Sequence, residues 1–179
     1  MAFTPATNRQ VPDHAILDNF YKQTYLGNAY IVSVPAIDLS TTSETGLILI
    51  QNPVITTSAF PANNVGVFVN LRRFSSDSEQ VVIKTYVNPI VSSVSTKTTP
   101  VNLRPASANT SIAKVYGSGE FSLSSNGTLI SAIGCAADDY VVMDNLLLVI
   151  LDPGQMLLIT GTALTEDTNV NADISWFEL

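Results

Sequence analysis

The sequence contains one cysteine, Cys135, and one histidine, His14, so a single chain cannot form a disulfide or a metal centre that needs several of these residues. A lone cysteine cannot form a disulfide within the chain or a cysteine-based zinc site. A lone histidine near the N-terminus cannot build the histidine-rich metal centre of cupin-type enzymes. Cys135 lies in the apolar stretch LISAIGCAA, where a free cysteine is expected to be a small core residue. The sequence therefore predicts neither a metal nor a cofactor.

Charged residues are also few, at 13% of the chain, about half of the usual quarter. Eight Lys and Arg stand against fifteen Asp and Glu, which gives a net charge of −7. A nucleic-acid footprint needs clustered cations, and we interpret the one basic doublet, Arg72-Arg73, as rim charge. Long charged helix formers are scarce while Val, Ile, Leu, Thr, Ser and Asn abound, a profile typical of β-rich proteins.

Long apolar runs and a secretory leader are likewise missing. The longest apolar run, Leu146–Leu151, ends at Asp152 after six residues, far too few to cross a bilayer. The first residues, MAFTPATNRQVPDH, contain neither the basic nor the apolar segment of a signal peptide. We therefore expect a protein that neither enters a membrane nor carries an export signal.

Residues 1–45 are predicted to be an N-terminal arm with a short helix and a lead-in strand. Asp13 is placed to cap the helix and Gly27 to end it. About three turns are not stable alone, so the helix must pack on its own domain or on a neighbouring subunit. Both alternatives stay open. In the second, docking falls to its apolar face, formed by Ile16, Leu17, Phe20, Tyr21 and Tyr25.

Residues 46–179 are predicted to be a β-domain. From about residue 28, turn residues separate short β-runs, namely AYIVSV, GLILIQ, VGVFVNLRRF, QVVIKTYV, SIAKVY, GTLISAI, LLLVIL, MLLITGTAL and NVNADISWFEL. In the last run the apolar residues alternate with polar ones, so we expect Val170, Ala172, Ile174 and Trp176 to be buried. The pattern predicts an all-β protein, a jelly-roll-like antiparallel β-sandwich of about eight to nine strands.

Three connections can be predicted from their turn residues. Pro153 and Gly154 suit the second and third positions of a type II turn. Asn126-Gly127 suits a hairpin turn between EFSLS and TLISAI. The stretch 97–111, KTTPVNLRPASANTS, is unlike a strand, and splitting the domain there would leave two marginal cores. We therefore predict that it is a long crossover between sheets or Greek keys.

Acidic residues are the candidates for catalysis. A glycosidase needs two facing carboxylates, which Asp138-Asp139 with Asp144, or Glu166-Asp167, could supply. Both groups fall in turn-like stretches, where acidic residues serve solvation and local hydrogen bonding, so no enzymatic role is predicted. The same DDYVVMD segment lacks the oxygen-rich spacing of a dedicated Ca²⁺ loop.

A set of turn residues and strand starts in the second half of the chain resembles a known group. The matching positions are Thr98, Pro100, Asn102, Leu103, Ser111, Ala113, Pro153, Gly154, Asn169, Trp176 and Glu178. In these residues, and in LILIQNP upstream, the chain is similar to virion structural proteins of tailed bacteriophages, a group of capsid-decoration, head-fibre and tail-associated proteins. The similarity covers most of residues 46–179.

The resemblance implies a jelly-roll-like trimer on the outside of a phage particle, made in the host cytoplasm. Its partners would be copies of itself and other virion proteins, such as the major capsid protein or tail components, without nucleic acid or membrane. We therefore expect a non-enzymatic structural protein that docks on capsid or tail through its arm. The alternative is a receptor- or glycan-binding module displayed on the virion, which exposed aromatics at Tyr86, Tyr116, Phe121 and Tyr140 would favour.

Overall fold

The computed structural model describes residues 28–54, 66–95, 97–103 and 111–178, and in this part the regular elements are β-strands. The strands are β1 (Asn28–Leu39), β2 (Thr45–Gln51), β3 (Val67–Ser76), β4 (Val81–Val87), β5 (Ile90–Val94), β6 (Val101–Asn102), β7 (Lys114–Gly117), β8 (Phe121–Ser125), β9 (Thr128–Cys135), β10 (Tyr140–Leu151), β11 (Met156–Ala163) and β12 (Thr168–Glu178).

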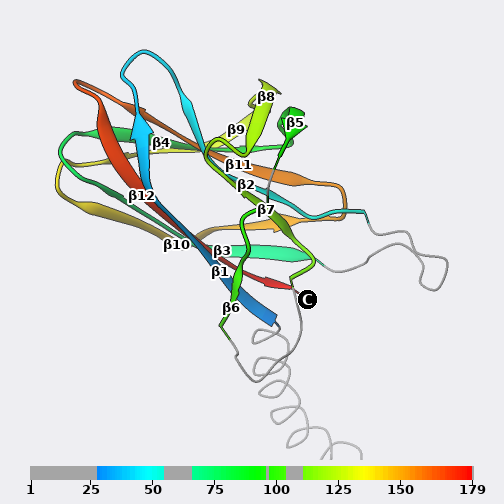
Figure 1. The fold of residues 1–179 in the computed structure, drawn as a ribbon. Helices are drawn as coiled ribbons and strands as arrows, with labels where there is room; N and C mark the ends of the chain where they lie inside the picture. Colours follow the sequence, from blue (N-terminus) through cyan, green and yellow to red (C-terminus); the bar gives the residue numbers. More distant parts are fainter. Residues whose placement is uncertain (1–27, 55–65, 96, 104–110, 179) are drawn as a thin grey trace, which may run out of the picture.

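Most strands belong to two stacked antiparallel sheets of five strands each (Figure 1). The first sheet has the order β10-β3-β12-β1-β6, and the second has the order β7-β2-β11-β4-β9. The pairs β1–β12, β2–β11, β3–β10 and β4–β9 are nested, as in one long hairpin rolled up into two layers. This is the strand order of a jelly roll, so the predicted fold class is confirmed. The lead-in strand β1, within residues 1–45, is an inner strand of the first sheet.

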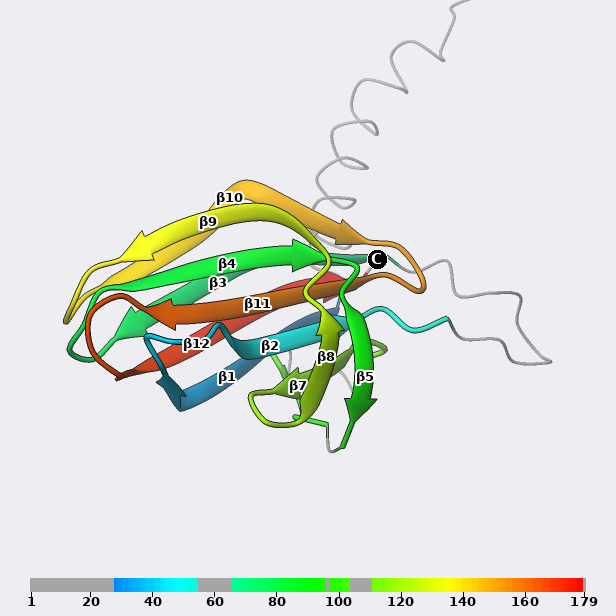
Figure 2. The same cartoon turned by 90° about the horizontal axis from the view of Figure 1, so that it is seen from above.

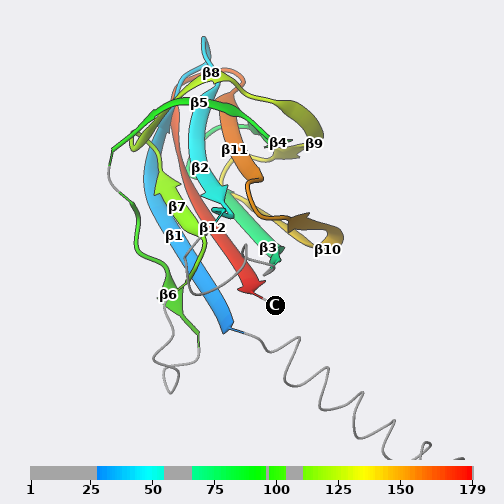
Figure 3. The same cartoon turned by 90° about the vertical axis from the view of Figure 1, so that its right-hand side faces the viewer.

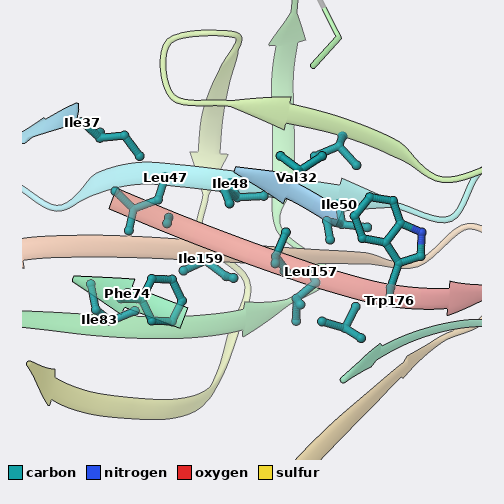
Figure 4. Packing of buried hydrophobic residues seen from close by; sticks show 14 of the residues in the cluster. Val32, Ile37, Leu47, Ile48, Ile50, Phe74, Ile83, Leu157, Ile159 and Trp176 are labelled. Atoms are coloured by element: carbon teal, nitrogen blue, oxygen red, sulfur yellow. The ribbon is translucent and has the colours of Figure 1, made fainter. Parts of the chain in front are cut away.

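Side chains on the facing surfaces of the two sheets form one core (Figure 4). Strand β12 confirms the predicted alternation, because Val170, Ala172, Ile174 and Trp176 are all fully buried. Cys135 is buried in the same core, as predicted. Full burial of an aliphatic or aromatic side chain of this size stabilises a fold by roughly 1.5–3 kcal/mol. The hydrophobic alternation read from the sequence is therefore what holds the two sheets together.

Arg72 is buried between the two sheets, contrary to its interpretation as rim charge. It is only 1% exposed and continues the inward face of β3 with Phe74, whereas Arg73 points to solvent. Its Nη1 atom lies 3.4 Å from the Thr85 hydroxyl of β4 in the opposite sheet. Burial lowers the pKa of the guanidinium below its usual value. The interpretation as rim charge is therefore wrong for Arg72, which is a core residue between the sheets.

The predicted type II turn at Pro153-Gly154 is confirmed. The Gln155 N–H donates to the Asp152 carbonyl at 2.9 Å, and Gly154 has a φ of 91°. Asn52, which is fully buried after β2, holds this turn from the side. Its backbone accepts from the Gly154 N–H at 2.7 Å and donates to the Gln155 carbonyl at 3.0 Å.

The predicted hairpin at Asn126-Gly127 is wrong, because β8 pairs with β5 and β9 pairs with β4. The dipeptide instead carries the chain from one pair of strands to the other. Gly127 is required there for two reasons: its φ is 87°, and a Cβ atom would lie 2.4 Å from the Val87 carbonyl oxygen. Sequence signals for a tight turn cannot distinguish a hairpin from a change of strand partner.

The segment between β4 and β9 is an addition to the eight jelly-roll strands. Strands β5 and β8 pair as a ribbon that runs across the second sheet (Figure 2; Figure 3). Strand β6 extends the first sheet beside β1, and β7 extends the second sheet beside β2. The described residues of the stretch 97–111 contact both sheets, because Thr98 forms a bridge to Val115 of β7 and β6 pairs with β1. This agrees with the predicted crossover between sheets, of which residues 104–110 lie outside the described part.

Candidate functional site

Four of the residues that carry the phage resemblance lie together around one buried carboxylate. Glu178, at the end of β12, is 8% exposed. It accepts hydrogen bonds from the Ser111 hydroxyl and, at 3.2 Å, from the indole N–H of Trp176. The backbone N–H groups of Ile112 and Ala113 donate to it at 3.1 Å each. These five residues, which we call the Glu178 clasp, tie the end of the crossover to the last strand.

The clasp is a structural lock. A buried carboxylate is stable only when hydrogen-bond donors replace the water that it loses, and here the chain itself supplies four donors. On β1, the Tyr30 ring stacks on the Trp176 ring with 5.8 Å between centroids. Burial, together with the charge of Glu178, raises the pKa of Tyr30 above its ordinary value. The clasp therefore joins the two ends of the jelly roll and the crossover in one buried cluster.

A second carboxylate, that of Glu120, fixes the start of the crossover. The Thr98 hydroxyl donates to it at 2.7 Å, and the Gly117 N–H donates to the same oxygen at 2.6 Å. The Thr98 N–H also donates to the Val115 carbonyl of β7 at 2.9 Å. Thr98 thus anchors one end of the crossover, as the clasp anchors the other.

The remaining resemblance residues are placed separately. Asn102 belongs to β6 and pairs with Tyr30 of β1, and the Leu103 N–H donates to the Ala29 carbonyl at 2.9 Å. Pro100 lies between these contacts and Thr98. Pro153-Gly154 forms the turn described above, outside the clasp. The structure therefore gathers Ser111, Ala113, Trp176 and Glu178. The others support the crossover or a turn, except for Asn169, which lies within β12 and pairs with Asp38 of β1.

The outer face of the second sheet carries a smaller apolar cluster under the β5–β8 ribbon. Apolar side chains of the ribbon pack on the outer face of the second sheet. They bury side chains of β2, β4, β7 and β11 that would otherwise face solvent. The buried members are Leu49, Tyr86, Tyr116 and Leu158, and the partly buried ones are Val91, Phe121, Leu123 and Met156.

Beside this cluster, Glu44 is the centre of a polar network that joins β2, β4 and β11. Its carboxylate forms an ion pair with the Lys84 ammonium at 2.9 Å and accepts a hydrogen bond from the Thr160 hydroxyl. The Tyr86 hydroxyl also bonds to Glu44, and Asn126 bonds to Tyr86 in turn. This network was not predicted from the sequence, although a lysine inside the apolar run VVIKTYV indicates that the lysine needs a partner.

The electrostatics of the network favour a fixed negative charge. Burial alone raises the pKa of Glu44, but hydrogen bonds from Thr160, Lys84 and Tyr86 and the charge of Lys84 outweigh it. The net result is a pKa below the ordinary value of 4.5. The hydrogen bond to Glu44 raises the pKa of Lys84, so both partners stay charged around neutral pH.

An open cleft of about 340 Å³ lies between this network and the ribbon. Glu44 and Asn126 line it on the polar side, and Phe121 and Leu123 of β8 line it on the apolar side. Gly46 lies beneath the Phe121 ring, where a Cβ atom would be 2.7 Å from two ring carbons. We call this feature the ribbon cleft.

Four of the predicted acidic candidates, Asp138, Asp139, Glu166 and Asp167, lie in turns between strands and do not line this cleft. Asp138 and Asp139 are exposed in the turn before β10, where Asp139 accepts from the Tyr140 N–H at 2.7 Å. Asp144 lies within β10, so the interpretation of DDYVVMD as a turn is wrong from Tyr140 onward. Glu166 and Asp167 precede β12, where Asp167 accepts from the Thr41 N–H at 3.1 Å. Asp139 thus binds the backbone of its own turn, and Asp167 binds the backbone of the distant connection between β1 and β2.

The four aromatic candidates divide into two buried and two accessible side chains. Tyr86 and Tyr116 are 9% and 3% exposed, so neither offers a stacking surface. Phe121 is half-buried and lines the ribbon cleft. Tyr140 is 59% exposed at the start of β10, where the Arg73 guanidinium lies 5.0 Å from the ring centroid.

The predicted docking face of the arm, Ile16, Leu17, Phe20, Tyr21 and Tyr25, lies outside the described residues. Among the residues that are described, no three His, Cys, Asp or Glu side chains are grouped so as to hold a metal ion. The same residues include no helix that is long and apolar enough to span a membrane. Comparison of the whole chain with protein-family models and with curated proteins finds no match.

Proposed function

We propose that this chain is a non-enzymatic structural protein of a bacteriophage virion, which self-associates as a trimer and docks on the capsid or tail through its N-terminal arm. The observation that carries the proposal is the Glu178 clasp. Four residues that the resemblance names, distant in sequence, meet there in one hydrogen-bonded unit. In this chain, the residues that carry the resemblance therefore form a three-dimensional unit as well as a string of residues.

Self-association is supported by the two edge strands on the open side of the sandwich. On the opposite side the edges are β6 and β7, two and four residues long, whereas β9 and β10 have eight and twelve residues. Long edges offer backbone groups for pairing. Five of the eleven large apolar side chains exposed in the described part lie on these two strands, namely Leu129, Ile130, Tyr140, Val142 and Ile150. We call these five residues the edge patch and assign self-association to it.

The first test is the molar mass in solution of the full chain and of a chain that starts at Asn28, measured by light scattering after size exclusion. A trimer of about 58 kDa, three times the chain mass of 19.2 kDa, is expected for the full chain. If the sandwich trimerises by itself, the shorter chain gives the corresponding trimer. A monomer for both chains contradicts the proposal.

The second test concerns docking. Phage particles from the phage that encodes the chain are labelled with an antibody against the purified protein and viewed by electron microscopy. We expect the label at fixed positions on capsid or tail, and we expect added full-length protein, but not the chain from Asn28, to bind particles stripped of it. Particles without label contradict the virion role, and equal binding by both chains contradicts docking through the arm.

A further inference from the structure

The ribbon cleft combines a fixed carboxylate, a side-chain amide and an aromatic ring around one space. Its volume of about 340 Å³ falls at the lower end of the roughly 300–1,000 Å³ of ligand pockets. The cleft lies where the β5–β8 ribbon meets the second sheet, and both walls belong to elements with well-defined packing: β8 is held by the apolar cluster and Glu44 by its ion pair. The walls are therefore positioned before any ligand arrives.

The polar wall has unused hydrogen-bonding capacity that faces the cleft. A carboxylate accepts about four hydrogen bonds. Lys84, Thr160 and Tyr86 account for three of those to Glu44, whose side chain keeps 21% of its surface exposed. Asn126 bonds to Tyr86, which leaves part of its amide for another partner. A ligand hydroxyl could thus donate to Glu44 while a neighbouring hydroxyl bonds to Asn126.

The apolar wall is formed by Phe121 and Leu123 of β8. Gly46 allows the Phe121 ring to lie close against β2, because any larger residue would collide with the ring. A half-buried ring held in this way presents a rigid apolar surface at little entropic cost. Its natural complement is a ligand with a flat array of C–H groups on one side and polar groups on the other.

We propose that the ribbon cleft binds a neutral pyranose ring, a single sugar unit of a glycan, with its C–H face on Phe121 and its hydroxyls towards Glu44 and Asn126. A neutral ligand suits the site, since Glu44 is already neutralised by Lys84 and the chain carries a net charge of −7 that repels anions. The inference rests on the geometry of the cleft and is independent of the virion role.

The test is saturation-transfer-difference NMR of the full chain with the methyl glycosides of glucose, galactose, mannose and N-acetylglucosamine, each titrated to 20 times the expected dissociation constant of about 1 mM. Millimolar affinity is reasonable for one ring in an open cleft. We expect saturable transfer for at least one glycoside, strongest at the ring C–H protons. No transfer to any of the four overturns the proposal.

Variants locate the binding site. Asn126→Ala removes the amide, and Phe121→Leu keeps an apolar side chain while it removes the flat ring. Each is expected to weaken binding at least fivefold. Leu164→Ala, which removes an exposed apolar side chain outside both the cleft and the edge patch, is the control and should leave affinity unchanged. Tyr140→Ala tests the other accessible aromatic as an alternative sugar site. If Phe121→Leu does not fold, Asn126→Ala decides alone.

Two outcomes of this series contradict the assignment. Wild-type affinity in both folded cleft variants places any sugar elsewhere. Loss of binding in Tyr140→Ala, with Asn126→Ala unaffected, places it on the first sheet beside Arg73. Folding of every variant is checked by its amide NMR spectrum, so that lost binding is not confused with lost structure. An oligosaccharide that ends in the preferred sugar should bind at least as tightly as the methyl glycoside, because the cleft is open.

Discussion

At the scale of single residues, the protein relies on a few carboxylates that the chain surrounds with its own donors. Glu178, Glu120 and Glu44 each join segments that are distant in sequence. In a chain with only 13% charged residues, these three acidic side chains carry much of the specific connection between elements. Hydrophobic burial is non-directional, whereas a carboxylate that is buried, like Glu178, or partly buried, like Glu120 and Glu44, must meet particular donors, so these residues help to fix which segments meet.

Replacing Glu178 with Gln tests the clasp. A carboxamide keeps the size of the side chain but turns an NH₂ group towards donors that now lack an acceptor. We expect a loss of about 1–3 kcal/mol in the free energy of unfolding, measured by urea denaturation. Glu166→Gln, at an exposed turn position, is the control and should change stability by less than about 0.5 kcal/mol. Equal effects of the two variants would show that the clasp adds nothing to stability.

The Glu44–Lys84 pair predicts a pH dependence of stability. Because the folded-state pKa of Glu44 lies below 4.5, the folded protein binds fewer protons at this site than the unfolded chain. The contribution of the ionised Glu44 to the free energy of unfolding is therefore complete above about pH 4.5, and it is lost as the pH falls through the folded-state pKa. We expect wild type to have a higher urea midpoint than Glu44→Gln at pH 7, and this difference to shrink towards pH 3. A difference that is independent of pH contradicts the role of the charge.

At the scale of elements, the eight jelly-roll strands and β7 could be predicted from the sequence, whereas β5 and β6 could not. Each of the nine predicted β-runs contains a strand, because alternating or continuous burial leaves a period in the sequence, although in SIAKVY the strand begins only at Lys114. Strands β5 and β8 have mostly exposed residues, so they carry no such period, and β5 was not predicted. Arg72 was misplaced for another reason: irregular register in β3 decides which face a residue joins, and that depends on its partners.

The turn into β9 gives a prediction at this scale. Gly127→Ala should destabilise the protein strongly, because it adds both a left-handed backbone cost of about 1–2 kcal/mol and a collision with the Val87 carbonyl. Gly119→Ala is a matched control, since Gly119 has a φ of 79° but nothing lies within 4 Å of an added Cβ. The difference between the two unfolding free energies measures the contact alone. If the two losses are equal, the close approach to β4 is not required.

For the candidate sites, too, single residues could be named from the sequence, but the contacts between them could not be predicted. The resemblance named Ser111, Ala113, Trp176 and Glu178 as residues, but only the fold brings them to one carboxylate. Glu44 and Lys84 lie 40 residues apart and were not linked, since no sequence spacing relates two strands that meet through a third. Such pairs can be predicted only once the strand order of the sheets is known, because neighbouring strands of a jelly roll are often far apart in the sequence.

At the scale of the whole molecule, the sandwich is asymmetric. One side is closed by the short strands β6 and β7 and by the crossover, and the other presents the long edges β9 and β10 with the edge patch. The ribbon covers part of the second sheet, and the arm precedes β1 in the first sheet. A molecule with one protected and one open side can join copies of itself on the open side without losing access to the other.

The edge patch gives the last prediction. Val142 and Ile150 are 39% and 49% exposed on β10, so replacing both with Lys places charge on the open edge without disturbing buried packing. We expect the molar mass to fall to the 19.2 kDa of a single chain while circular dichroism keeps its β-sheet signal. Leu164→Lys, at a residue 54% exposed in the turn before β12, is the control and should keep the wild-type mass. A double variant that stays at the oligomeric mass would assign self-association to another surface, because two charges desolvated at an apolar interface would not be tolerated there.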